Sequence, residues 1–256
     1  MHRLNLLIFV IGIIWSGLAY AEDEDAEDLA EKKGLVIVEP LNVITTEEKG
    51  EYRLLPYPER RSKWGFMASL GYSSYEPLNY EPAYAPAGTS FYEVYGGADM
   101  PLIELAFTIK RNLAMGAIGL EIGAGMTQNA TADKDYGDSF LRIIPIKVML
   151  NYYLDTMGKE PVLAPYIGGG AYVMQFREEL DSEASNGSTQ AAPYIHAGIA
   201  FQLDWIDRAA ATISYRESGI QSSFIYVEAQ SYMISSAQSD EDFSSFSYAG
   251  GMKLEF

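Results

Sequence analysis

The chain has 256 residues, of which 48% are hydrophobic and only 21% are charged, which excludes a chain disordered throughout and leaves no room for several large domains. Its formal net charge of -17 excludes the basic surface that nucleic-acid binding requires. The sequence has no cysteine and only two histidines, His2 and His196, which excludes disulfides, thiolate chemistry and imidazole-rich metal sites. We therefore expect neither a cofactor nor a bound metal.

The first 21 residues have the features of an export signal. Arg3 precedes an apolar run over 4–15, and Ala19 and Ala21 supply the small residues of a cleavage site. A retained membrane anchor is the alternative, but this run is shorter than the ~20 apolar residues that a spanning helix needs. We expect cleavage after Ala21, and no later segment is apolar for long enough to form a transmembrane helix.

Residues 22–63 are predicted to form an acidic, mostly extended periplasmic arm. The arm opens with the acidic run 22–28, which repels itself and stays solvated, and prolines interrupt any long element after it. Only the apolar stretch 35–38 is suited to pair as a short strand. The arm is therefore either a leader without a partner or a docking segment for another periplasmic component.

From Trp64 onward, apolar and polar residues alternate with period two, segment after segment. Within 102–109, the odd positions carry Ile, Leu, Phe and Ile, whereas Glu104 and Thr108 lie on the opposite face. Small residues occupy both faces of the fifth segment, so the pattern leaves its facing open. Eight segments are predicted as strands: 64–75, 100–109, 116–126, 139–153, 163–176, 193–204, 209–217 and 243–256.

This alternation fits either a soluble lipocalin-like barrel with the apolar face inside or a membrane barrel with that face outside. Strand length favours the membrane barrel, because a tilted strand needs ~9–11 residues to cross the bilayer core. Connection length favours it as well, because long outer loops alternate with short periplasmic turns in such barrels. The long connections are predicted at 76–99, 127–138, 177–192 and 218–242, and the short ones at 110–115, 154–162 and 205–208. The predicted fold is all-β: an eight-stranded, antiparallel, up-and-down transmembrane β-barrel over 64–256, with both termini on the periplasmic side.

Two local motifs add to this pattern. The fifth segment contains Ala164-Pro165-Tyr166-Ile167-Gly168-Gly169-Gly170-Ala171-Tyr172, and the chain ends in Lys253-Leu254-Glu255-Phe256. With these motifs, residues 64–256 resemble the small eight-stranded outer-membrane barrel family, the type represented by the OmpA and OmpX transmembrane domains. The resemblance implies a location in the bacterial outer membrane and a C-terminal strand that is recognised by the barrel-assembly machinery. That family includes adhesins, membrane anchors, small pores and a few lipid-modifying enzymes, so the fold does not select the activity.

Five polar side chains are expected to meet inside the barrel at comparable heights: Glu104, Glu121, Lys147, His196 and Arg216. One interpretation is a packed plug of ion pairs and hydrogen bonds, because eight strands enclose a space just wide enough for side chains. The other is a narrow passive pore, gated by Lys147 or Arg216 as it exchanges between Glu104 and Glu121.

An enzymatic role is the least favoured alternative. Lipid-modifying barrels of this size use a serine activated by a histidine. After export, His196 is the only histidine left, and no serine lies two residues from it on the same face. We predict no catalytic residue and expect His196 to be an interior residue with satisfied hydrogen bonds.

The long loops are expected to be the working surface. The first loop combines prolines with aromatic residues, a composition enriched in protein and glycan contacts, and its candidate contact residues are Tyr75, Tyr80, Tyr84, Tyr92 and Tyr95. The third and last loops are acidic, with Glu178, Glu179, Asp181 and Glu183 in one and Glu228, Asp240, Glu241 and Asp242 in the other. These carboxylates either keep the loops solvated or hold divalent cations that bridge to lipopolysaccharide or to a partner. Whether 224–227 extends the barrel as a hairpin is left open by the pattern.

At the opposite rim, a basic cluster stands beside an aromatic anchor, an arrangement suited to phospholipid head groups. The predicted lipid interface consists of Arg60, Arg61, Lys63, Trp64, Trp205 and Phe256. The sequence thus favours a structural or surface-interaction, adhesin-like role, with the passive pore as the main alternative. The expected partners are outer-membrane lipid and lipopolysaccharide, the assembly machinery, and an extracellular protein or glycan, but no nucleic acid.

Overall fold

The computed structural model describes residues 35–38, 51–54, 56–77, 79–83, 85–96, 100–133, 137–158, 160–180, 183–237 and 241–256. The predicted export signal lies outside these residues. The chain divides into two compact units, Met1–Leu55 and Pro56–Phe256. In the first unit, β1 (Leu35–Val38) pairs antiparallel with β2 (Glu51–Leu54), so the short strand predicted at 35–38 is confirmed.

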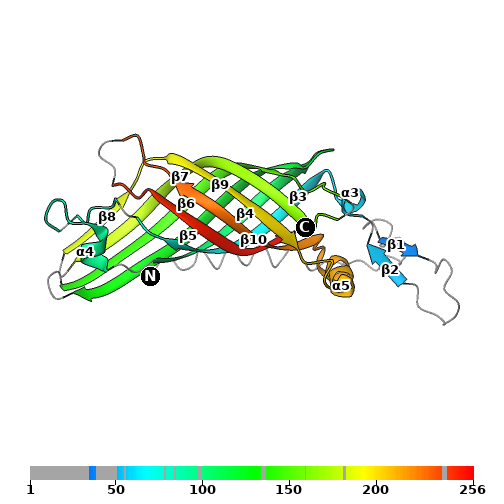
Figure 1. Cartoon of the computed structure of the whole chain (residues 1–256), viewed down its shortest axis with the longest axis horizontal. Helices are drawn as coiled ribbons and strands as arrows, with labels where there is room; N and C mark the ends of the chain where they lie inside the picture. Colours follow the sequence, from blue (N-terminus) through cyan, green and yellow to red (C-terminus); the bar gives the residue numbers. More distant parts are fainter. Residues whose placement is uncertain are drawn as a thin grey trace, which may run out of the picture. The chain divides into compact units, whose positions relative to one another are not determined.

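The second unit is a closed, antiparallel barrel of eight strands (Figure 1). The hydrogen-bonded order is β6-β5-β4-β3-β11-β10-β9-β7, and pairing of β6 with β7 closes the ring. The barrel strands are β3 (Trp64–Tyr75), β4 (Met100–Asn112), β5 (Ala117–Asp133), β6 (Gly137–Tyr153), β7 (Leu163–Leu180), β9 (Ala192–Gln202), β10 (Ser222–Tyr232) and β11 (Ser245–Glu255). The predicted all-β barrel is confirmed.

Among its described residues, this unit also contains three short helices and one additional strand. They are α3 (Tyr57–Arg60), α4 (Phe91–Tyr95), α5 (Arg208–Ser218) and β8 (Glu183–Ser188). Strand β8 pairs with the outer part of β7 and extends it as a hairpin. None of the helices in the described part of the chain is long and apolar enough to cross a membrane.

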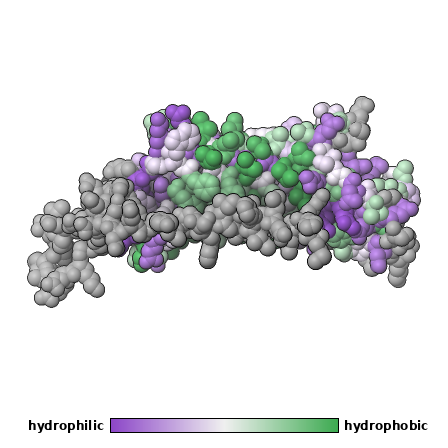
Figure 2. Space-filling view, turned by 180° about the vertical axis from the view of Figure 1, so that it is seen from behind, coloured by the Kyte–Doolittle hydropathy of each residue, from purple (hydrophilic) through white to green (hydrophobic). Residues whose placement is uncertain are grey.

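The period-two pattern places the apolar face outside and the polar face inside. On β4, Leu105 is 49% exposed while its neighbour Glu104 is 7% exposed; on β6, Val148 is 47% exposed while Lys147 is 4% exposed. On the face visible in Figure 2, hydrophobic residues occupy the middle and hydrophilic residues gather towards both ends. Such a surface suits a bilayer, because strands can cross lipid only when every backbone group finds a partner in a closed sheet.

The prediction of a strand over 209–217 was wrong. This segment forms helix α5: its N-terminus is capped by Asp207, which accepts a hydrogen bond from the Ala210 amide, and Gly219 ends it in a left-handed conformation. The barrel strand is β10, so 224–227 lies in the barrel wall. Because one strand replaces another, the barrel still closes with eight, but the 203–221 connection at the periplasmic end is longer than expected.

Three strands run well beyond the length that a bilayer requires. Strands β5 and β6 have 17 residues each and β7 has 18, so most of the loop predicted at 127–138 is strand, and only 134–136 separates β5 from β6. We call the outer parts of β5, β6 and β7, together with β8, the outer extension. Much of the predicted loop surface is thus a rigid sheet.

Candidate functional site

The barrel interior holds a buried ion pair. The Glu104 carboxylate lies 2.7 Å from the Lys147 ammonium group, so the structure brings these two predicted lumen residues together. Lys147 also donates a hydrogen bond to the Tyr194 hydroxyl (3.2 Å), and the Tyr232 hydroxyl donates to Glu104 (2.9 Å). Each charge therefore has a charged partner and a neutral one, as a buried pair requires.

His196 occupies a second buried network. Its Nδ1 lies 3.1 Å from a Glu228 oxygen and its Nε2 lies 2.8 Å from the Asn151 amide oxygen, so both ring nitrogens are engaged. Asn151 in turn donates to Glu121 (2.7 Å), and the Tyr166 hydroxyl donates to Glu228 (2.7 Å). Glu228, which we assigned to the last long loop, is an interior residue because β10 is a barrel strand.

Two details of this network escaped the sequence analysis. Lys253 places its ammonium group 4.0 Å from the Tyr166 ring centroid and 4.5 Å from that of Tyr226, an aromatic environment that stabilises a buried cation. Gly168 gives His196 its space, because a Cβ there would overlap the His196 ring and the Asn151 side chain. Gly168, the first glycine of the run in β7, therefore serves the interior.

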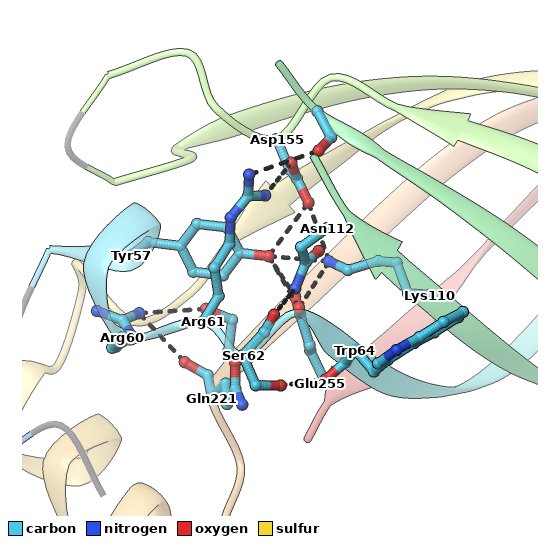
Figure 3. A network of polar contacts seen from close by, with 12 residues as sticks. Tyr57, Arg60, Arg61, Ser62, Trp64, Lys110, Asn112, Asp155, Gln221 and Glu255 are labelled. Carbon is cyan, nitrogen blue, oxygen red and sulfur yellow. Dashed lines mark hydrogen bonds and ion pairs between the residues drawn. The ribbon is translucent and has the colours of Figure 1, made fainter. Parts of the chain in front are cut away.

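The periplasmic end of the barrel is closed by five residues that we call the inner plug: Tyr57, Arg61, Lys110, Asp155 and Glu255 (Figure 3). Lys110 lies 2.6 Å from Glu255 and 2.9 Å from Asp155, and Arg61 lies 2.9 Å from Asp155. The Tyr57 hydroxyl donates to Glu255 at 2.7 Å. Burial, reinforced by the Glu255 carboxylate, raises the pKa of Tyr57 well above its usual value.

Two arginines of the predicted lipid interface lie at this end of the barrel instead of facing lipid. The side chains of Arg60 and Arg61 are buried and turn towards carboxylates at the barrel end. Arg60 lies 2.9 Å from Glu160 and 3.6 Å from Asp204. Arg60 donates hydrogen bonds to both oxygens of Glu160, at 2.9 and 3.2 Å, which is the paired, charge-assisted contact that guanidinium groups form most strongly. Burial raises the pKa of Asp204, and Arg60 opposes that rise.

The rest of the predicted interface is accessible. Lys63 is exposed, and Trp64, Trp205 and Phe256 are 57%, 53% and 36% exposed. Arg216 lies on α5 and is exposed, so it is not one of the lumen residues. Residues 56–63, which we assigned to the arm, belong to the barrel unit.

The opposite end is closed by an aromatic cluster that we call the outer plug: Tyr75, Tyr80, Phe91, Tyr95 and Phe243, each almost fully buried. Tyr80 stacks on Phe243 with ring centroids 4.6 Å apart, and Phe91 stacks on Tyr95 at 5.1 Å. The prediction that Tyr75, Tyr80 and Tyr95 contact a partner at the surface was therefore wrong. Packing buries them because the first loop folds back over the barrel end.

Two tyrosines of that loop remain to be placed. Tyr92 is 50% exposed on α4, and Tyr84 lies outside the described residues. The loop is held by Glu178, which is fully buried and accepts hydrogen bonds from the Tyr95 hydroxyl (2.7 Å) and the Ala83 amide (2.9 Å). Burial, together with Glu178, raises the pKa of Tyr95 far above its usual value.

This arrangement can stabilise a fold but offers no chemistry that we can identify. Both nitrogens of His196 are occupied, and no serine hydroxyl is among its hydrogen-bond partners in the described part of the chain. Among the same residues, no three histidine or carboxylate side chains converge as a metal site would require. The interior is therefore a packed network rather than an open reaction site.

Eight closed strands, an apolar exterior and a packed polar interior define a small outer-membrane β-barrel. No protein-family model and no curated protein matches the sequence. Solved structures that resemble it include Ail, the attachment invasion locus protein of Yersinia pestis (10% identity over 76% of this chain and 100% of that chain, TM-score 0.43). They also include OprG of Pseudomonas aeruginosa, with 16% identity over 75% of this chain and 95% of that chain and a TM-score of 0.44. Neisserial surface protein A has 10% identity over 76% of this chain and 98% of that chain, with a TM-score of 0.41.

Proposed function

We propose that the protein is a sealed outer-membrane barrel with a structural and surface-interaction role, and neither a pore nor an enzyme. The observation that carries this proposal is the filled interior. Inward side chains of all eight barrel strands join one another through hydrogen bonds or ion pairs, from Gln230 with Ser73 and Ser247 to the networks around Lys147 and His196. A plug closes each end of this network.

The outer extension is the proposed contact surface. Because Tyr75, Tyr80 and Tyr95 are buried, the accessible groups are Tyr92 and the small polar side chains of β8, most of which are exposed. Strand β8 pairs with β7 alone among the described strands, so its other edge is open. Exposed hydroxyl and amide groups on a rigid hairpin suit hydrogen bonding to an extracellular glycan or protein.

Single-channel conductance of the refolded chain in a planar bilayer tests the sealed barrel. We expect no steady openings, after gel mobility with and without boiling has shown that the sample is folded. Openings whose size or frequency changes in Lys147→Gln would overturn the proposal and establish the gated pore, because only lumen residues should alter ion flow.

Binding of cells that display the protein to glycan arrays and immobilised matrix proteins tests the contact surface. We expect binding that is lost when 183–188 is replaced by a Gly-Ser segment of equal length. A matched replacement of 114–115, in the turn at the periplasmic end, should leave binding unchanged. Equal loss in both variants, or none in either, would contradict the role of the outer extension.

A further inference from the structure

Four polar side chains form one row across the outer extension. Strand register places Gln128 opposite Arg142, and Arg142 directly opposite Arg177. Arg177 is in turn opposite Asn186 of β8. All four are at least partly exposed, and Arg142 lies in the same phase of β6 as the outward-facing Ile146. We call these four residues the outward polar row.

The outward polar row lies at the outer margin of the apolar belt. Between Tyr152 at the periplasmic end and Arg142, the outward side chains of β6 are all apolar: Leu150, Val148, Ile146 and Ile144. Ten residues at about 3.3 Å each, tilted by about 40°, span about 25 Å along the membrane normal, which is the height of the apolar band in such barrels. The two arginines therefore stand where the head groups of the outer leaflet begin.

In the described part of the chain, only one of the two charges of this row is balanced by a carboxylate. Like charges directly opposite each other on neighbouring strands are destabilising, yet Arg142 and Arg177 face each other. Glu179 pairs with Arg177, but in the described part of the chain Arg142 has no carboxylate partner. Its Nε is buried without a hydrogen-bond acceptor, and its guanidinium stacks 5.4 Å from the Phe140 ring. An anion beside the two arginines would give Arg142 the acceptor that it lacks and would reduce the repulsion between the two guanidinium groups.

We propose that the outward polar row binds a phosphate of a phosphorylated outer-leaflet glycolipid, the chemical class to which lipopolysaccharide belongs. Guanidinium groups bind phosphate through paired, charge-assisted hydrogen bonds, and the flanking amide groups of Gln128 and Asn186 add neutral donors. The position beside the apolar belt favours a lipid-borne phosphate, because acyl chains can then pack on the strands below it. This site requires only that the barrel spans the outer membrane, so it does not depend on the surface-interaction role.

Native mass spectrometry of the refolded protein in detergent, titrated with lipid A, tests this site. Wild type should bind diphosphorylated lipid A about ten-fold more tightly than the dephosphorylated lipid, as expected for one charge-assisted contact. Arg142→Gln combined with Arg177→Gln should lose this preference. Arg111→Gln combined with Arg208→Gln removes the same charge from exposed arginines elsewhere and should retain it.

Each outcome decides the proposal, provided that gel mobility with and without boiling shows every variant to be folded. Unchanged phosphate preference in the Arg142/Arg177 variant would overturn the site, as would equal loss in the Arg111/Arg208 control. Displacement of lipid A by millimolar inorganic phosphate would assign the row to soluble anions instead of lipid. Arg142→Lys combined with Arg177→Lys keeps the charge but not the paired donors, and should retain an intermediate preference.

Discussion

The two ends of the barrel are closed by different physical means. The inner plug is made of buried charges, with Lys110 between Glu255 and Asp155, whereas the outer plug is made of stacked aromatic rings around Tyr80 and Phe243. Buried charges tolerate the loss of a partner poorly, because the remaining charge is left without compensation. Aromatic packing depends on contact area and yields more gradually. The inner plug therefore depends on the exact pairing of its charged groups, whereas the outer plug holds the first loop in place through packing.

The largest expected effect is that of Lys110→Met, which removes a buried cation from the inner plug. The substitution preserves most of the side-chain volume but leaves the buried carboxylates of Glu255 and Asp155 short of one cation. We expect the free energy of unfolding, measured by urea titration in lipid vesicles, to fall by about 3–5 kcal/mol.

Lys63→Met provides the matched control for this prediction. Lys63 is exposed near the same end of the barrel, so its loss should change the free energy of unfolding by no more than about 0.5 kcal/mol. Lys110→Met combined with Glu255→Gln should recover part of the loss, because one unpaired charge is removed as well. Equal effects of the two single substitutions would mean that the inner plug is solvated and contributes little.

Glu178→Ala should break the outer plug locally while the barrel stays folded. Glu178 accepts from Tyr95 and Ala83, and hydrogen bonds to a charged group contribute about 1.5–3 kcal/mol each. Losing even one of them should raise the rate of chymotrypsin cleavage in 76–99 by about ten-fold or more, since cleavage follows local opening.

Two comparisons make the Glu178 result specific. Glu183→Ala removes an exposed carboxylate from the neighbouring strand and should leave the cleavage rate near that of wild type. The unfolding midpoint of Glu178→Ala in urea should shift far less than that of Lys110→Met. Cleavage that is no faster than in Glu183→Ala would show that packing of Tyr80 and Phe91 holds the loop without Glu178.

The wall of the barrel was predictable from the sequence, whereas its plugs were not. Period-two alternation is a local property, so strands such as 64–75 and 139–153 were found. The same pattern placed Glu104 and Lys147 inside at comparable heights, but it did not decide which carboxylate Lys147 pairs with. The signal fails at 209–217, where the predicted strand is helix α5. This segment begins with three alanines and its alternation rests on Ile213 and Tyr215, so the cap at Asp207 decides in favour of the helix.

The plugs depend on contacts between residues far apart in the chain. Tyr57 and Glu255 are separated by 198 positions, and no local pattern indicates that a tyrosine of an acidic arm enters a barrel end. In the same way, a loop rich in tyrosine and proline has the composition of a binding surface, and only its folding back over the barrel buries Tyr75 and Tyr80. Composition predicted which residues matter there but not which side they face.

The smallest expected effect is that of Glu241→Gln on hydrogen exchange near the outer plug. Burial, with the Glu178 and Glu81 carboxylates, raises the pKa of Glu241, so the folded loop binds a proton more tightly than the unfolded loop does. Stability from the protonated form is present below the unfolded pKa and is lost as pH rises through the folded pKa.

Hydrogen exchange of the α4 amides, corrected for intrinsic rates, should therefore slow on acidification in wild type. At neutral pH, Glu241→Gln should already exchange about two-fold more slowly and should lack this pH dependence. A Glu241→Gln profile that follows wild type would assign the titration to another carboxylate, and Glu183→Gln controls for the loss of surface charge.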